Sequence, residues 1–350
     1  MTADYSRHDE ALALLMGLGP DLTNWMTSHV PMVAEALAAM GEATASITWT
    51  GAHRKTVQPR GAPSAPIASD NWRAALGQRW HFADWSVFFS GEIARDGWQT
   101  VCDRWTARLA PGFAAAATHG VIRTGHAARA LRAAETPPRR QEFADALALW
   151  ASTYVELPAV RRASAKLSPL DALERVRLVP KEKRQNGGAI TVALGQLTHA
   201  PGFDGVLDLL DTERSPEAVA LEAAEAFARV VVANVQSPLT AIVFTHGVTG
   251  AAAALNLLPH VRAATGQALV AYAWQSGAAL VSAYASVPFD AAKPVPASAC
   301  VDRVARAVAH GDDHVIKLTE ACLALNARRP SAAFEAATDA VAAHLPEDRS

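Results

Sequence analysis

Apolar residues recur along most of the chain at the three-to-four-residue spacing of helices that bury one face. Asp70 looks like the N-cap of a helix over about 70–80. An aromatic-rich stretch, 82–109, follows it and is interrupted by Pro111 and Gly112. The best short strand candidate is 189–194, and the segments 51–70 and 176–188 read as loops. The pattern predicts one mostly α-helical domain, 1–350, with little or no sheet. Further helices are expected over 8–19, 29–41, 113–134, about 138–157, 215–236, about 239–258, 266–286, 298–309, 312–328 and 331–344.

Composition narrows the class of protein. Of the 350 residues, 50% are hydrophobic and 19% charged, which favours a packed globule over a disordered chain. The net charge of −2 provides no basic field for nucleic acid or an anionic membrane, and polar residues interrupt every apolar run before it reaches membrane-span length. The first 30 residues show no signal-peptide pattern. The three cysteines lie far apart, which argues against a disulfide scaffold, so we expect a cytoplasmic protein.

Common nucleotide and hydrolase motifs are missing from the sequence. It contains no GxGxxG after a strand, no GxxxxGK[ST] and no GxSxG. A Rossmann site, a P-loop and an α/β-hydrolase are therefore unsupported.

The clearest chemistry lies in the histidines. His119 and His126 are seven residues apart, so on a helix they share one face with Arg123, among small neighbours. One interpretation is two satisfied core histidines beside a salt-bridged arginine; the other is a ligand-binding face. His29 begins a predicted helix, and His246 lies in an apolar stretch that predicts burial.

His314 and Lys317 form a second pair, which shares a face at i and i+3. Asp312 or Asp313 can cap the start of this helix. Lys317 can form a surface ion pair with Glu320, three residues later. Alternatively, burial neutralises its amine, and a neutral amine can react with carbon dioxide to give an anionic carbamate.

These histidines lie in motifs that resemble a known family. The segments TSHVPMVAEAL, FFSGEIARDGWQTVCDRWTARLAPG, THGVIRTGHAARAL, THGVTGAAAALNLL and GDDHVIKLTEAC occur in order along nearly the whole chain. Together they resemble the bacterial branch of the questin oxidase-like proteins, whose fungal relatives open anthraquinone-type rings with dioxygen.

The resemblance implies a non-haem iron held by histidines and a carboxylated lysine. By motif, the lysine is Lys317 with His314 beside it, and His119, His246 and His29 match further histidine positions of the family. Fungal members tend to carry another histidine where this chain has Arg123, so His126 competes for that ligand place.

The expected function is an iron-dependent oxygenase that acts with dioxygen on a polycyclic aromatic or quinone, by ring opening or Baeyer–Villiger-type oxygen insertion. Arg123 would stabilise a phenolate. An aromatic set would line a flat pocket, unless it is plain core packing: Trp25, Phe88, Phe89 and Trp98. Use of NADPH and the oligomeric state stay open. The alternatives are a metal-independent oxygenase and a non-catalytic helical protein that binds an apolar ligand.

Overall fold

The computed structural model describes residues 2–160, 164–185, 187–211 and 213–348. It is mostly α-helical, as the sequence predicts. The α-helices are α1 His8–Ala13, α2 Val30–Ala39, α3 Ala43–His53, α4 Phe82–Asp96, α5 Trp98–Leu109, α6 His119–Ala133, α7 Pro137–Ser152, α8 Pro169–Leu173, α9 Ile190–Leu194, α10 Pro216–Asn234, α11 Pro238–Leu257, α12 Ala263–Tyr284, α13 Arg303–His310, α14 Asp313–Arg328 and α15 Ala332–Ala342. The 3-10 helices are η1 Arg54–Thr56, η2 Trp72–Ala75, η3 Arg79–His81, η4 Ala110–Gly112, η5 Lys181–Lys183, η6 Gly195–His199, η7 Phe203–Leu209 and η8 Leu258–His260.

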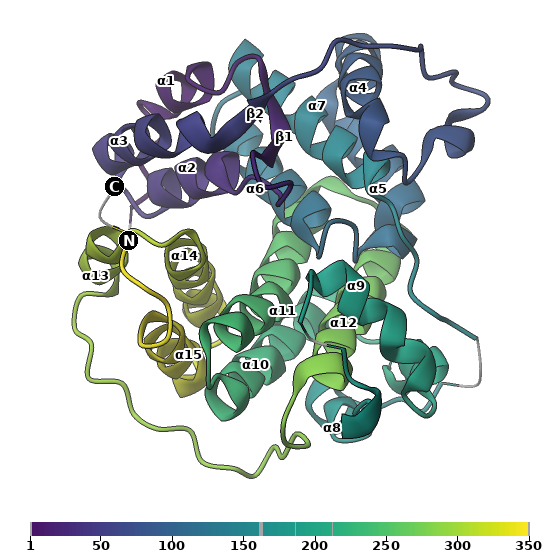
Figure 1. Ribbon diagram of the computed structural model, residues 1–350, viewed down its shortest axis with the longest axis vertical. Coiled ribbons are helices and arrows are strands. Elements are labelled where there is room, and N and C mark those ends of the chain that lie inside the picture. The colour runs from purple at the N-terminus through teal and green to yellow at the C-terminus, as the bar shows by residue number, and fades with distance from the viewer. Residues whose placement is uncertain (1, 161–163, 186, 212, 349–350) are drawn as a thin grey trace.

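Helix α11 lies at the centre of the molecule (Figure 1). It packs against its sequence neighbours α10 and α12, and also against α6 and α14, which come from more distant parts of the chain. Helix α2 packs against both α6 and α14, so α2, α6, α11 and α14 surround one internal region. The functional site is built there.

The helix ends carry the capping chemistry expected from the sequence. Ser215 accepts from the backbone N–H of Ala218 at the start of α10, with Pro216 in the first turn. At the start of α14, Oδ1 of Asp312 accepts from the backbone N–H groups of His314 and Val315. These caps satisfy donors that have no partner inside the helix.

Several predicted elements are wrong in kind or length. The strand candidate 189–194 is the helix α9, because a short apolar run does not distinguish a strand from a buried helical turn. The predicted helix 8–19 ends at Ala13. Its remainder enters strand β1, Leu18–Leu22, which pairs antiparallel with β2, Val57–Pro59. The helix predicted after Asp70 is replaced by η2 and η3.

The two predicted loops differ in how much regular structure they contain. Segment 51–70 contains the end of α3, η1 and strand β2, and its other residues form no regular element. Segment 176–188 contains η5 and otherwise no regular element among its described residues; residue 186 lies outside them.

One helical stretch, Pro238–His260, is long and apolar enough to cross a membrane by length and composition. Of its most apolar window, 78% is buried inside the protein. This stretch includes α11, and central helices of globular proteins commonly have this composition.

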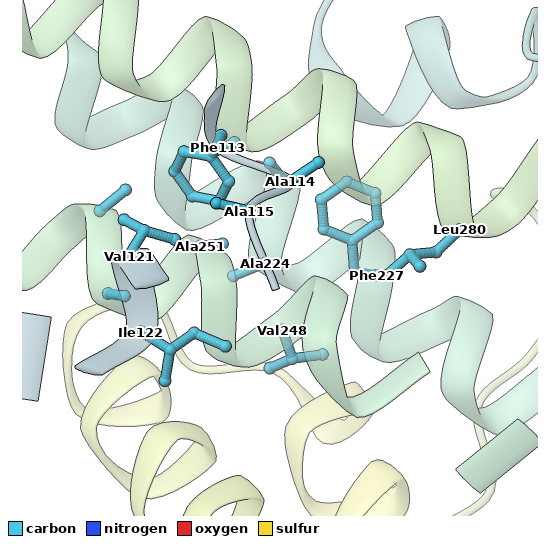
Figure 2. Close-up of a cluster of buried hydrophobic side chains, with 14 of the residues drawn as sticks. Phe113, Ala114, Ala115, Val121, Ile122, Ala224, Phe227, Val248, Ala251 and Leu280 are labelled. Carbon is cyan, nitrogen blue, oxygen red and sulfur yellow. The ribbon is translucent and has the colours of Figure 1, made fainter. Parts of the chain in front are cut away.

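The core beside the functional site is aliphatic and aromatic (Figure 2). Val121 and Ile122 of α6 lie in one buried cluster with Val248 of α11 and Phe227 of α10. This packing fixes α6 against α11, and each of these two helices carries a histidine of the site.

Candidate metal centre

Four histidines from four helices meet inside the protein. His29 is the N-cap of α2, His119 is the first residue of α6, His246 lies in the middle of α11, and His314 lies in the first turn of α14. The ring centroids of His29 and His119 are 4.4 Å apart, and those of His119 and His246 are 4.7 Å apart. His314 lies 4.8 Å from His29 and 5.5 Å from His246, also by ring centroids.

The backbone before α6 is strained. Ala116, Ala117 and Thr118 have φ angles of 48°, 55° and 72°, in the left-handed region that residues with a Cβ rarely adopt. The sequence predicts a helix through this segment, but the left-handed turn delays the start of α6 until His119. Strain of this kind persists where the surrounding structure demands it, commonly at functional sites.

Hydrogen bonds to the backbone fix the tautomers of two histidines. Nδ1 of His119 lies 2.5 Å from the carbonyl oxygen of Ala116, and Nδ1 of His246 lies 2.7 Å from that of Ile242. A carbonyl only accepts, so each Nδ1 carries the proton and each Nε2 presents a lone pair. The two Nε2 atoms are 3.1 Å apart. Two lone pairs at this distance repel each other unless a cation lies beside them.

Asp313 orients the other two histidines. Its Oδ2 lies 2.8 Å from Nδ1 of His29, and its Oδ1 lies 2.5 Å from Nδ1 of His314. A carboxylate at Nδ1 holds the proton there and makes Nε2 a stronger donor to a metal. Nε2 of His314 is buried and has no hydrogen-bond partner among the residues that the structure describes.

The electrostatics of the site disfavour protonated imidazoles. Burial, with the neighbouring imidazoles and Lys317, lowers the pKa of His119 and of His246 well below 6.5. Burial also lowers the pKa of His29 to about 4, against the opposing charge of Asp313. Protonation of His29, His119 and His246 is therefore disfavoured near neutral pH, and a metal ion fits their donor set.

Lys317 is buried beside this cluster, with 2% of its surface exposed. Burial lowers the pKa of its amine, although Asp313 and Asp312 oppose the shift. Among the described residues no carboxylate oxygen lies within 4.0 Å of Nζ, and Glu320 instead pairs with Arg129. The surface ion pair between Lys317 and Glu320 is therefore wrong, because both residues are buried and Glu320 has another partner.

The amino-acid sequence indicates the family of this chain independently of the geometry of the site. The sequence model of the questin oxidase-like family matches residues 26–322, which is most of the chain. The chain belongs to the questin oxidase-like family. It is therefore an oxygenase-type enzyme, an oxidoreductase. A search of curated proteins found no match.

The questin oxidase-like motifs do not bring every candidate ligand to the centre. His126 points its Nδ1 at Oε2 of Glu35, 2.6 Å away, and thus belongs to a neighbouring ionic cluster. Arg123 donates from Nε and Nη2 to the two carboxylate oxygens of Glu142, at 2.7 and 2.8 Å. Glu142 thereby pairs the charge of Arg123. Arg123 is therefore not a free cation that could stabilise a phenolate, as the sequence led us to expect.

The predicted aromatic pocket is replaced by core packing for three of its four members. Phe88 and Phe89 pack edge-on against Trp105, and Trp98 packs against Phe143. Aromatic rings pack well against one another in this way, so the spacing that suggested a pocket wall also builds a core. Trp25 is 72% exposed and lines a surface pocket together with residues of β1 and β2.

Sequence reasoning missed the role of Asp313. The GDDH segment contains two aspartates, and a helix start needs only one N-cap. The structure assigns the cap to Asp312 and leaves Asp313 for the imidazoles. The surplus carboxylate next to a histidine was the available signal.

Proposed function

We propose that this enzyme is a non-haem iron-dependent oxygenase acting with dioxygen on a polycyclic aromatic or quinone substrate. The observation that carries the proposal is the pair of Nε2 lone pairs of His119 and His246, 3.1 Å apart, beside the unpartnered Nε2 of His314. Three to four imidazoles with an anionic oxygen donor suit iron(II) among the first-row metals.

The residues around this centre would have different roles. His119, His246 and His314 would bind the metal through Nε2, with His29 as the fourth imidazole, and Asp313 holds the protons on two Nδ1 atoms. Iron would supply the redox chemistry that lets dioxygen react with a closed-shell organic molecule. His119, His246 and His314 are buried, which limits the access of water to the place where the metal would bind.

Lys317 is proposed to supply the anionic oxygen. A lowered pKa makes the neutral amine more available, and this is the form that adds carbon dioxide to give a carbamate. No carboxylate within 4.0 Å among the described residues competes for Nζ. The side chain lies one turn after His314 on the same face of α14.

The first experiment measures metal content. The full chain, loaded anaerobically with iron(II) and desalted, is expected to retain about one equivalent of iron per chain, because imidazole and anionic oxygen donors suit iron(II). His119→Gln and His246→Gln are expected to lose it. His126→Gln is the matched control, since His126 lies on α6 but contacts Glu35. Equal iron retention in all three variants would contradict the proposal.

The second experiment addresses Lys317 directly. With ¹³C-bicarbonate, the iron-loaded protein is expected to gain bound carbon dioxide that mass spectrometry detects, and Lys317→Arg is expected to lose both this label and the iron. Lys317→Glu should restore part of the iron, because it returns an anionic oxygen. Full iron retention in Lys317→Arg would overturn the carbamate, since guanidinium cannot form one.

Oxygen uptake with a hydroxyanthraquinone completes the test of the reaction. Incorporation of one or two ¹⁸O atoms into the product separates monooxygenation from dioxygenation. Uptake that survives chelation and iron removal would assign the activity to a metal-independent oxygenase.

A further inference from the structure

A pocket of about 410 Å³ is lined partly by residues of the elements that carry the histidine centre. Two of its lining residues are adjacent to the centre: Ser28 precedes His29, and Arg123 follows His119 by one helical turn. The volume falls within the range of small-molecule sites. The pocket therefore has the size of a small-molecule site and shares α6 and the start of α2 with the histidine centre.

Most of the pocket wall is aliphatic. The N-terminal segment contributes Leu12, Leu15, Met16 and Leu18, and the opposite wall includes Pro31 and Val57. Such a wall binds the apolar body of a ligand by removing it from water.

The polar end of the pocket is electrically balanced. Arg123 and Glu142 form a two-point ion pair, and Arg60 pairs with Asp145. All four residues line the pocket, and their formal charges cancel. An anionic ligand would meet two carboxylates whose countercharges are already engaged, which is a repulsive element against carboxylic acids.

One donor remains available at this end. Arg123 uses Nε and Nη2 for Glu142, and its Nη1 makes no hydrogen bond within the described part of the chain. The second lone pairs of the Glu142 oxygens can accept a hydroxyl proton. A hydroxyl or carbonyl group of an uncharged ligand can therefore be bound without breaking the ion pair.

We infer that this pocket binds an uncharged, largely apolar molecule through one hydroxyl or carbonyl group, and that Glu142 is the residue that excludes carboxylates. As a substrate site the inference rests on the proposed function, but binding to the pocket is measured without iron and without turnover. If the protein retains no iron after loading but binds the ligand as described, the pocket is supported while the iron-dependent oxygenase is contradicted.

The test compares two fluorescent probes of the same ring system, 2-naphthol and 2-naphthoate, by titration at neutral pH. The wild-type protein is expected to bind 2-naphthol at least about tenfold more tightly than 2-naphthoate, because one hydrogen bond to a charged group contributes about that much affinity. Leu15→Trp narrows the pocket and should weaken 2-naphthol binding. Val301→Trp, at a position that is 99% exposed, is the matched control and should leave binding unchanged.

Glu142→Gln tests the charge argument. It keeps the shape of the side chain but frees the charge of Arg123, so the preference should shift toward 2-naphthoate by about tenfold or more. If this variant does not fold, Arg123→Met/Glu142→Leu removes both charges together, which proteins commonly tolerate. That variant should bind 2-naphthol more weakly than the wild type does. Equal wild-type affinity for the two probes, or unchanged 2-naphthol binding in Leu15→Trp, would overturn the inference.

Discussion

At the scale of single residues, the state of the site depends on where each imidazole keeps its proton. Backbone carbonyls hold the proton of His119 and His246 on Nδ1, while the carboxylate of Asp313 lies at ion-pair distance from Nδ1 of His29 and of His314 and favours the proton there. All four rings can then direct Nε2 to one place. A single carboxylate that serves two rings is the most vulnerable part of this arrangement.

Asp313→Asn is therefore expected to weaken iron binding by about 10- to 100-fold, the usual effect of removing the partner of a ligating histidine. The amide keeps the size but loses the charge that holds the Nδ1 protons. Asp312→Asn is the control, because asparagine also caps a helix and Asp312 Oδ1 is 3.9 Å from Nδ1 of His314. Metal competition titrations of the two variants provide the measurement, and equal affinities would contradict the role of Asp313.

At the scale of helices, two glycines set how closely α6 approaches its neighbours. A Cβ on Gly125 would lie 2.8 Å from Cα of Ala253 on α11, and one on Gly120 would lie 2.7 Å from Cα of Trp150 on α7. Backbone atoms cannot rotate away, so a larger residue must push the helices apart. The spacing of α6 and α11 also sets the spacing of His119 and His246.

Gly125→Ala is expected to destabilise the protein by about 1–3 kcal/mol, as overpacking does, and to weaken iron binding as well. Gly91→Ala, in the middle of α4 with nothing within 4 Å of the added methyl group, is the matched control. It should stabilise the protein by about 0.5–1 kcal/mol through helix propensity. Urea unfolding and iron titration of both variants give the comparison; a stabilised Gly125→Ala would show that the contact is looser than described.

At the scale of the whole molecule, a buried ionic cluster joins the elements around the site. Arg129 of α6 donates to Glu35 of α2 and to Glu320 of α14, while Tyr5 and His126 also contact Glu35. The cluster therefore connects α2, α6 and α14, three of the four helices that carry the histidines of the metal centre, with the N-terminal segment. Removing one partner leaves a buried charge uncompensated.

Arg129→Met is expected to lower the free energy of unfolding by about 3–5 kcal/mol, because Glu35 and Glu320 stay buried without their cation. Lys166→Met is the control, since its ion pair with Glu213 is exposed and contributes about 0–1 kcal/mol. Urea unfolding measures both. Similar losses in the two variants would contradict a structural role for the cluster.

Glu35 also predicts a pH dependence. Burial alone would raise its pKa, but Arg129 and His126 hold it well below the ordinary 4.5. A carboxylate with a lowered pKa contributes stability above about pH 4.5, and this contribution is lost as the pH falls. The unfolding free energy of the wild type should therefore fall more between about pH 5 and pH 3 than that of Glu35→Gln. A parallel fall in both proteins would show that Glu35 is not the group responsible.

The sequence by itself determined the helical class, the main helices and four of the histidines that meet. Helical periodicity is a local property, so α10, α11 and α14 could be read from spacing, proline and caps. Family motifs identified His119, His246, His314 and Lys317 as candidates for one site, together with His29 or His126, although these residues span nearly 290 residues of chain.

Only the tertiary structure decided which charged groups pair with which. Arg123 and His126 share a helix face with His119, but Glu142 and Glu35 come from other helices and engage them. The choice of Asp313 over Asp312 for the imidazoles and the left-handed turn before His119 depend on packing in the same way. Helical spacing in the sequence shows which residues lie on one face of one helix. Which charged groups form ion pairs depends on the helix that packs against that face, and this contact is not local in the sequence.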